Sequence, residues 1–261
     1  MSSLPDYAAA LSAFHRCAGD SLHAIVRSLP LTPGMRVLDA PCGDGTYLPW
    51  LRECVGDSGR VVGADRSAAF LELASEQRGA ELVQADFDDL PSPFDFAWCA
   101  HSLYSLPDPA AGLASLRRVL VPGGRIGILE NDSFHHWLLP WPIELEVAVK
   151  RAQLDELAAT TPHWTKAYVG RNLGALLHEA GFLEIVVRTL SVDHRAPLSE
   201  DEKLVLRDYL SGLRKLTWKR LEPSLQRAFE EFETSFAHRT DFTASHLEVV
   251  ATAKKPDAER T

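Results

Sequence analysis

The sequence VLDAPCGDG occupies residues 37–45. The apolar run at residues 36–39 is typical of a short buried strand, and the glycine-rich turn after it leads into a helical stretch that begins at Tyr47. In an open α/β sheet, ligands bind where such strands end, and Gly43 and Gly45 would let the backbone approach a ligand closely. Taken alone, this stretch also fits a tight strand-to-helix turn that binds nothing.

The chain around this stretch alternates between strands and helices. Apolar runs of strand type occupy residues 36–39, 60–65, 81–85, 94–99 and 125–129. Helical stretches lie between them, which predicts a mostly parallel sheet covered by helices on both faces. Two longer strand-type runs, residues 184–192 and 243–253, lack such a crossover helix between them and predict an antiparallel pair at one edge. The expected fold class is therefore α/β: a doubly wound seven-stranded sheet, mostly parallel with an antiparallel last strand, plus helical insertions.

Composition limits the partners that this chain can have. The 261 residues include 27 Lys and Arg and 36 Asp and Glu, a formal net charge of −9, whereas nucleic-acid binding needs clustered basic residues. No apolar, charge-free segment approaches the ~18 residues that cross a bilayer, and no basic residue precedes the first apolar stretch as in a secretory signal. The four cysteines form neither a CxxC pair nor a zinc-site spacing. These features predict a cytoplasmic protein, a monomer or homodimer, that binds no nucleic acid, membrane or metal.

The charge of the glycine-rich loop indicates which ligand it holds. A dinucleotide requires a third glycine where this chain has Leu48, and Asp39 and Asp44 would repel its anionic pyrophosphate. A ligand that carries a cation therefore fits better. Asp65 comes 20 residues after Gly45, the spacing at which a carboxylate reaches a ribose diol.

Asp86 and Phe87 follow the third strand in the same way. There a carboxylate can accept a hydrogen bond from an adenine amino group while an aromatic ring stacks on the base. Each carboxylate alone could be a solvated loop residue, but their joint placement at successive strand ends favours one nucleoside site.

These segments together resemble the class I S-adenosylmethionine-dependent methyltransferases, which have a Rossmann-like fold, and are similar to the branch typified by ubiquinone and menaquinone biosynthesis methyltransferases. The matching segments are residues 37–45, 62–65, 85–87, 94–97, 101–108 and 116–124. The resemblance implies S-adenosyl-L-methionine as cofactor, with its methionine part on the first loop, its ribose on Asp65 and its adenine on Asp86 and Phe87. The cofactor-binding residues that it implies are Asp39, Ala40, Gly43, Gly45, Asp65, Arg66, Asp86, Phe87 and His101. The chain departs from the family at Pro41, where glycine is common.

The resemblance also implies the reaction, which is in-line transfer of a methyl group to an oxygen, nitrogen or carbon atom of a small-molecule acceptor. A hydroxyl acceptor benefits from a general base. The candidate bases are His101, Tyr104, His135 and His136, and the alternative for each histidine is an ordinary packing or surface role. A nucleotide-dependent oxidoreductase of Rossmann type and a non-catalytic S-adenosylmethionine-binding module are the alternative functions.

The expected domain organisation follows from where the alternation of strands and helices is interrupted. Residues 1–34 form an N-terminal helical cap, residues 35–131 and 170–261 form the cofactor-binding domain, and residues 132–169 and 198–240 are helical insertions that cover the acceptor site. Trp137, Trp141 and Trp164 lie in the first insertion. They either form an aromatic wall over a flat or apolar acceptor or pack the inserted helices.

Overall fold

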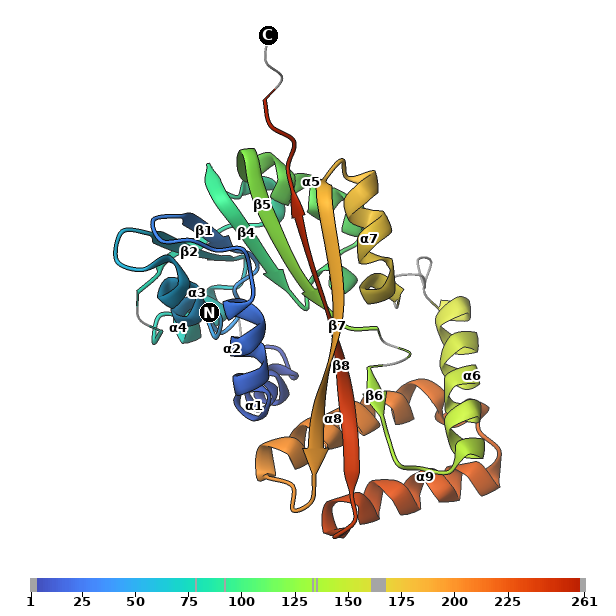
Figure 1. Cartoon of the computed structure of the whole chain (residues 1–261). Coiled ribbons are helices and arrows are strands. Elements are labelled where there is room, and N and C mark those ends of the chain that lie inside the picture. The colour runs from blue at the N-terminus through green and yellow to red at the C-terminus, as the bar shows by residue number, and fades with distance from the viewer. Residues whose placement is uncertain are drawn as a thin grey trace.

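The computed structural model describes residues 4–77, 79–91, 93–132, 134, 136–160 and 168–258 (Figure 1). Its centre is a parallel sheet with the strand order β3-β2-β1-β4-β5. The bounds of these strands are β1 (Arg36–Asp39), β2 (Arg60–Asp65), β3 (Glu81–Gln84), β4 (Phe94–Ala100) and β5 (Leu120–Glu130). The strand order reverses between β1 and β4, so the carboxyl ends of these two strands flank the crevice in which a ligand is expected.

Two long strands complete the sheet. β8 (Thr243–Lys254) runs antiparallel to β5 and also to β7 (Leu183–Arg195). The prediction of a mostly parallel seven-stranded sheet with an antiparallel last strand is thereby confirmed. The structure adds an eighth strand, β6 (Trp137–Leu138), which pairs with the outer part of β8. The sequence does not reveal β6 because two residues are too few to show an alternation of apolar and polar side chains.

Helices cover both faces of the sheet. One face carries α5 (Pro109–Val119) and α7 (Val169–Glu179), and the other carries α2 (Gly19–Arg27), α3 (Leu48–Val55) and α4 (Ala68–Ala74). Successive side chains of a strand point to opposite faces, so Val37 packs in the core under α2 and α3 while Leu38 packs under α5 and α7.

The starts of two helices follow from local sequence. Oγ of Ser67 accepts a hydrogen bond from the N–H of Phe70 at 3.3 Å, and Oδ1 of Asp108 accepts one from the N–H of Ala110 at 2.9 Å. Pro109 occupies the first position of α5, where its missing N–H costs nothing. Both helices therefore begin at a side-chain cap.

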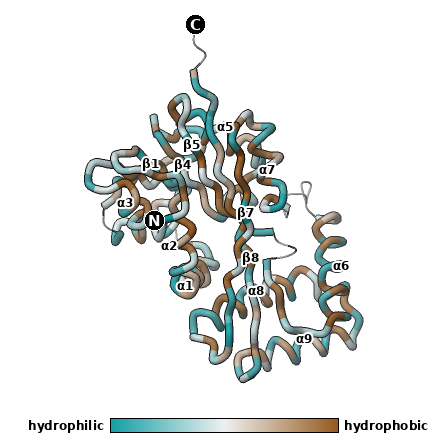
Figure 2. The backbone as a smooth tube through the Cα atoms, in the orientation of Figure 1, coloured by the Kyte–Doolittle hydropathy of each residue, from teal (hydrophilic) through white to brown (hydrophobic). Residues whose placement is uncertain are grey.

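Beyond the end of β5, β7 and β8 continue as a two-stranded ribbon into a second lobe (Figure 1). The ribbon is surrounded there by β6, α6 (Ile143–Thr160), α8 (Glu200–Thr217) and α9 (Pro223–Ser235). The N-terminal helix α1 (Ala8–Cys17) packs against α8. Figure 2 shows apolar stretches in brown along the strands and α6, and the second lobe has a hydrophobic core of its own.

The tryptophans of the first insertion belong to this second core. Trp137 is 4% exposed, and the ring of Trp141 packs against Phe229 and Phe232 with centroid distances of 6.0 and 5.6 Å. The structure thus favours packing of the inserted helices over an aromatic wall for these two side chains. Trp164 lies outside the described residues.

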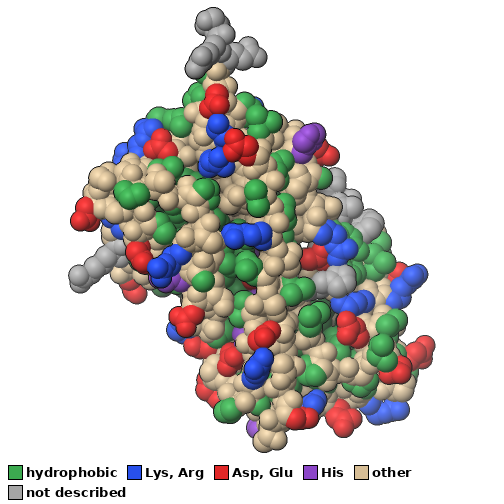
Figure 3. All heavy atoms as spheres, in the orientation of Figure 1, with side chains coloured by type: hydrophobic (Ala, Val, Ile, Leu, Met, Phe, Trp, Pro, Cys, Tyr) green, Lys and Arg blue, Asp and Glu red, His purple; other side chains and the backbone are tan. Residues whose placement is uncertain are grey.

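The surface and the remaining sequence features fit an ordinary globular chain. On the face seen in Figure 3, acidic and basic side chains are interspersed over both lobes. Within the described ranges, no helix has the length and apolar character to span a bilayer, and no cluster of His, Cys, Asp or Glu is arranged to hold a metal ion. All four cysteines are free thiols.

Candidate functional site

Three carboxylates meet at the carboxyl ends of β1 and β2. Asp39 is fully buried, and neither of its carboxylate oxygens has a hydrogen-bond partner among the described residues. Burial, and then the charges of Asp65 and Asp44, raise the pKa of Asp39 well above its ordinary value. A buried carboxylate without a partner is costly, so this site favours a ligand that brings a positive charge or hydrogen-bond donors. The ammonium and sulfonium groups of S-adenosylmethionine meet that requirement.

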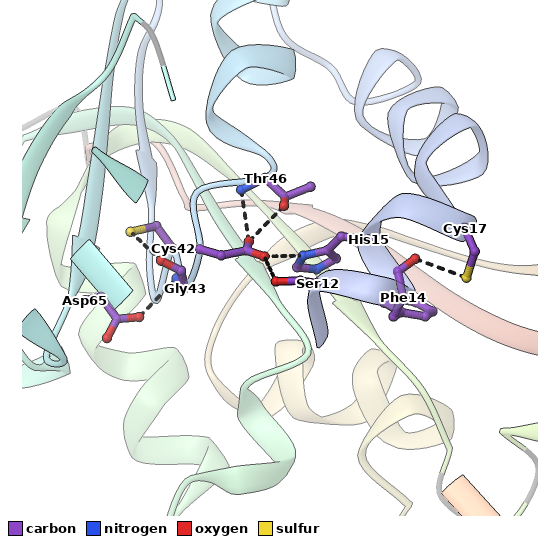
Figure 4. Close-up of polar contacts among 9 residues, drawn as sticks. Ser12, Phe14, His15, Cys17, Cys42, Gly43, Thr46 and Asp65 are labelled. Carbon is purple, nitrogen blue, oxygen red and sulfur yellow. Dashed lines mark hydrogen bonds and ion pairs between the residues drawn. The ribbon is translucent and has the colours of Figure 1, made fainter. Parts of the chain in front are cut away.

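Asp65 holds the loop that follows β1. Its Oδ2 accepts a hydrogen bond from the N–H of Gly43 at 3.0 Å (Figure 4), and its Oδ1 accepts one from the N–H of Ser67 at 2.8 Å. Burial raises the pKa of Asp65, although both hydrogen bonds act in the opposite direction. The same carboxylate therefore fixes both the glycine-rich loop and the start of α4.

The two loop glycines adopt left-handed backbone conformations, but only Gly45 is also crowded. Its φ is 79°, and a Cβ placed on it would lie 2.9 Å from the Cα and Cβ of Ala74 in α4. Gly43 has a φ of 51°, and a Cβ there would meet nothing within 4 Å.

Gly45→Ala is therefore expected to destabilise the protein by roughly 2–4 kcal/mol, and Gly43→Ala by only about 1–2 kcal/mol, the cost of the left-handed conformation alone. Urea unfolding of the two variants beside the unmodified protein measures the difference. Equal losses of stability would show that the contact with Ala74 relaxes freely.

The N-terminal helix reaches into the same site. Oδ2 of Asp44 lies 3.0 Å from Nδ1 of His15 and accepts a hydrogen bond from Oγ of Ser12 at 3.4 Å. Oδ1 accepts hydrogen bonds from the N–H and the hydroxyl of Thr46. Figure 4 shows both α1 side chains pointing toward the loop. Burial would raise the pKa of Asp44, but His15 and Thr46 hold it below its ordinary value. Sequence analysis missed Ser12 and His15 because polar residues on an amphipathic helix carry no motif.

An open cleft of about 400 Å³ lies beside this contact, a volume within the usual range for small-molecule sites. Its lining includes Ser12, His15, Asp44, Thr46, Trp50 and Gln77. A smaller hollow of about 160 Å³ lies among the first residues of the strands, including Arg36 and Arg60. That hollow is at the opposite edge of the sheet, far from the glycine-rich loop.

The residues predicted for the nucleoside lie in a row along neighbouring strand ends. Asp86 is exposed after β3, and its Oδ1 accepts a hydrogen bond from the N–H of Phe87 at 2.7 Å. Phe87 packs partly against the core of the sheet, and Arg66 is exposed after β2. Ala40 is buried after β1. The structure thus brings the predicted cofactor residues to one edge, with the acidic cluster at its centre.

His101 directly follows β4 and has a strained conformation. Its φ is 48°, a left-handed value that residues other than glycine seldom adopt. Nε2 of the ring lies 2.7 Å from Oε2 of Glu248, which is fully buried on β8. The ring is 13% exposed, and its Nδ1 has no hydrogen bond within the described part of the chain. Burial alone would lower the pKa of His101, but the charge of Glu248 raises it above 6.5. Strain together with a buried ion pair is typical of functional sites.

A second buried carboxylate organises the turn after His101. Oε1 of Glu130 accepts hydrogen bonds from the N–H groups of Ser102 and Leu103 at 2.8 and 2.6 Å. Burial raises the pKa of Glu130 to about 7, although the charge of His101 lowers it in part. Sequence analysis missed Glu130, and the available signal was a lone acidic residue at the end of an otherwise buried strand.

The other candidate bases have different surroundings. The pKa of His136 is lowered to about 4 by burial, and its ring lies 5.9 Å from that of His246 between centroids. His136 is therefore a neutral imidazole in the same buried cluster as His101 and Glu248. Tyr104 is 46% exposed in the short helix η2 (Leu103–Ser105), and His135 lies outside the described residues.

Comparisons with known proteins agree with this geometry. Residues 37–124 match the profile of a family described as "Methyltransferase domain". The chain is 30% identical over 214 residues to nocamycin O-methyltransferase from Saccharothrix syringae, covering 75% of each protein. It is 41% identical over 109 residues to 2-phytyl-1,4-naphtoquinone methyltransferase from Synechococcus elongatus, covering 38% of this chain and 46% of that protein.

Solved structures extend the likeness in fold to nearly the whole chain. A crystal structure of a putative methyltransferase from Bacillus halodurans superposes with a TM-score of 0.58 at 17% identity, covering 90% of this chain and 99% of that one. The chain spans about half the length of several curated relatives that it matches. The family profile covers the segment that carries the acidic loop and the first strands.

Proposed function

This chain belongs to the class I S-adenosylmethionine-dependent methyltransferases, and we propose that it methylates a small-molecule acceptor, favouring a hydroxyl on a flat or largely apolar ring. The observation that carries the proposal is Asp39, which is buried beside Asp44 and Asp65 and has no hydrogen-bond partner among the described residues. Asp39 ends β1, and His101 follows the neighbouring strand β4. Two relatives support this kind of acceptor: one is named as a methyltransferase of a naphthoquinone, and the other as an O-methyltransferase of nocamycin. An oxidoreductase is not favoured, because the same carboxylates oppose a pyrophosphate.

Different residues of this chain would bind different parts of the cofactor. When bound, S-adenosylmethionine supplies an electrophilic methyl group on a sulfonium. Asp39 would neutralise the positive charge at the methionine end of the cofactor. Asp65 and Arg66 would lie along its ribose. Asp86 and Phe87 would hold the adenine. The φ of Gly43 and Gly45 lets the loop approach closely without side chains.

His101 would act as the general base toward the acceptor. A hydroxyl becomes a strong nucleophile only as it loses its proton, and a base within hydrogen-bond reach contributes typically 10²–10⁴-fold. The free Nδ1 of His101 is the atom that would take this proton, while Glu248 holds the ring through Nε2. His136, and the candidates Tyr104 and His135, would then shape the acceptor site rather than move the proton.

The domain organisation and the cellular setting also belong to this proposal. Residues 1–34 would cap the cofactor, and residues 132–169 and 198–240 would enclose the acceptor side. We place the protein in the cytoplasm as a monomer or homodimer that acts on small molecules rather than on nucleic acid or membranes. The net charge of −9 and the four free thiols support this setting.

Titration calorimetry with four ligands tests the proposed function. We expect S-adenosylmethionine and S-adenosylhomocysteine to bind with dissociation constants on the order of micromolar, and NAD and NADP to give no heat. Release of S-adenosylhomocysteine in the presence of a panel of phenols and hydroxyquinones then tests turnover. Binding of NADP without a response to S-adenosylhomocysteine would refute the cofactor assignment, and binding without turnover would favour a non-catalytic module.

A further inference from the structure

A line of polar contacts with one longer step crosses the ribbon of β7 and β8. Oε1 of Glu202 lies 2.8 Å from Nδ1 of His194, and Nε2 of His194 lies 2.9 Å from Nδ1 of His246. Nε2 of His246 lies 3.5 Å from Oε1 of Glu248, and neither of these two atoms has a hydrogen-bond partner among the described residues. Oε2 of Glu248 lies 2.7 Å from Nε2 of His101. These five residues are called the Glu202–His101 chain below.

The Glu202–His101 chain is buried in its middle and partly exposed to solvent at both ends. Its three inner members have side chains that are at most 2% exposed, whereas those of Glu202 and His101 are 18% and 13% exposed. The ring of Trp137 packs beside the two inner histidines with centroid distances of 5.0 and 5.1 Å. Protons could therefore pass along these contacts while bulk water stays outside.

Donor and acceptor counting restricts how hydrogens occupy the chain. Each of its three hydrogen bonds needs one hydrogen between the two atoms. Burial lowers the pKa of His246 to about 3, so this ring is neutral and has a single N–H. With that N–H at Nδ1, His246 donates to Nε2 of His194, and His194 donates from Nδ1 to Glu202. Nε2 of His246 and Oε1 of Glu248 then face each other without a hydrogen between them, and both lack a hydrogen-bond partner in the described part of the chain.

A proton on Glu248 completes this line of contacts. Held at Oε1, it can be donated to Nε2 of His246 when the two atoms approach more closely than 3.5 Å. The hydrogens of the other three contacts then also point from His101 toward Glu202.

We propose that the Glu202–His101 chain carries the acceptor's proton from the reaction site to solvent, an inference that rests on the proposed methyl transfer. As the acceptor's bond to hydrogen breaks and its bond to the methyl carbon forms, the hydrogen goes to Nδ1 of His101, with the electron pair of the carbon–sulfur bond left on sulfur. His101 passes its Nε2 hydrogen to Oε2 of Glu248, and the carboxyl group turns to present that hydrogen to His246. One hydrogen then crosses each further contact, and Glu202 releases the last to water. One proton enters and one leaves, so atoms and charge balance.

The groups around the inner end favour proton uptake there. Glu130 on β5 and Glu248 on β8 both face His101 and favour its protonated form. His136 and Tyr209 of α8 pack together beside His246, and burial keeps both of them neutral near pH 7, since it lowers the pKa of His136 and raises that of Tyr209.

The outer end favours proton release. Oε2 of Glu202 accepts hydrogen bonds from the N–H and the hydroxyl of Ser199, at the N-terminus of α8. A helix N-terminus stabilises an ionised carboxylate, so a proton that reaches Glu202 passes readily to water. The neighbouring Asp201 is paired with Arg16 of α1, which leaves Glu202 as the member that exchanges with solvent.

Glu202→Gln tests the conduit without disturbing the fold, because glutamine also completes a capping box but cannot carry the proton. Glu200→Gln is the matched control, since Glu200 has the same charge in the same helical turn, is 84% exposed and pairs only with Lys203 among the residues described. The probe is exchange of the buried ring N–H of His246 with solvent, followed by ¹⁵N NMR on the full, ligand-free chain. We expect this exchange to be at least about tenfold slower in Glu202→Gln and within about twofold of the unmodified protein in Glu200→Gln.

Titration of His101 in the same spectra reports coupling across the chain. Its midpoint should fall by about 0.5 pH unit or more in Glu202→Gln and stay within about 0.2 unit in Glu200→Gln, since only the former removes the terminal proton acceptor. Unchanged exchange of the His246 N–H in Glu202→Gln, or equal slowing in both variants, would overturn the proposal. Neither readout requires cofactor or acceptor, so a failure to bind S-adenosylhomocysteine would reject the proposed function separately.

Discussion

Asp39→Asn is expected to make the cofactor-free protein more stable by about 1–3 kcal/mol, because it removes a buried carboxylate charge that has no partner. The same substitution is expected to weaken S-adenosylhomocysteine binding at least about tenfold, or ~1.4 kcal/mol. The two effects have one cause. Asp39 is fully buried, lacks a hydrogen-bond partner within the described chain and lies near two other carboxylates. A ligand that brings a cation removes this cost, so the same residue destabilises the empty protein and stabilises the complex. Urea unfolding and calorimetric titration of the variant measure the two effects.

The stabilising effect of this substitution should depend on pH. The pKa of Asp39 is raised in the folded protein, so its protonated form adds stability that is fully present below its unfolded value of 3.8 and is lost as the pH rises through the folded value. The advantage of Asp39→Asn should therefore be small in acid and should grow toward neutral and alkaline pH.

Asp95→Asn is the matched control, with the same change of charge at the opposite end of the strands. Asp95 accepts a hydrogen bond from the backbone N–H of Arg36 at 2.8 Å and pairs with its guanidinium, which lowers the pKa of the carboxyl against the effect of burial. This variant should lose stability and keep its affinity for S-adenosylhomocysteine. If Asp39→Asn also lost stability, a partner that the apo geometry does not reveal would be holding Asp39.

The parts of this molecule that were predictable are those encoded within a few residues. The glycine-rich loop and the acidic strand ends Asp39 and Asp65 follow directly from apolar runs of strand type. The caps Ser67 and Asp108 follow from capping patterns. Parallel strands bring their carboxyl ends to one edge regardless of distance in sequence, so the alternation alone predicted that these carboxylates meet.

The polar chain in the ribbon was not predictable in the same way. His194 and His246 are 52 residues apart and meet only through the register that pairs β7 with β8, and a slip of one residue would turn either side chain to the other face. A weaker signal was present, because His246 and Glu248 alternate with apolar neighbours and so share one face of a long strand. Nothing local, however, indicates that this face is covered by α8 and Trp137.

His101→Asn is expected to lower kcat by about 10²–10⁴-fold for an acceptor hydroxyl, the usual contribution of a general base, while affinity for S-adenosylhomocysteine stays within about threefold. Asparagine tolerates the left-handed conformation that position 101 requires, with its φ of 48°, so the fold should persist. Acceptors that release S-adenosylhomocysteine in the phenol and hydroxyquinone panel provide the assay. Loss of S-adenosylhomocysteine affinity in parallel with kcat would instead mean that His101 holds the cofactor or the fold.

The pH dependence separates a base from a merely structural histidine. His101 can take a proton only in its neutral form, and Glu248 raises its pKa above 6.5, so kcat should rise with pH through a midpoint above 6.5 and then level off. Stability should change in the opposite sense, since the ion pair with Glu248 contributes fully below pH 6.5 and is lost as the pH rises through the folded value. His101→Asn should remove both dependences together. A variant that kept the rise of kcat with pH would show that another group accepts the proton, and His136, whose pKa of about 4 leaves it neutral over the whole range, could not produce that rise.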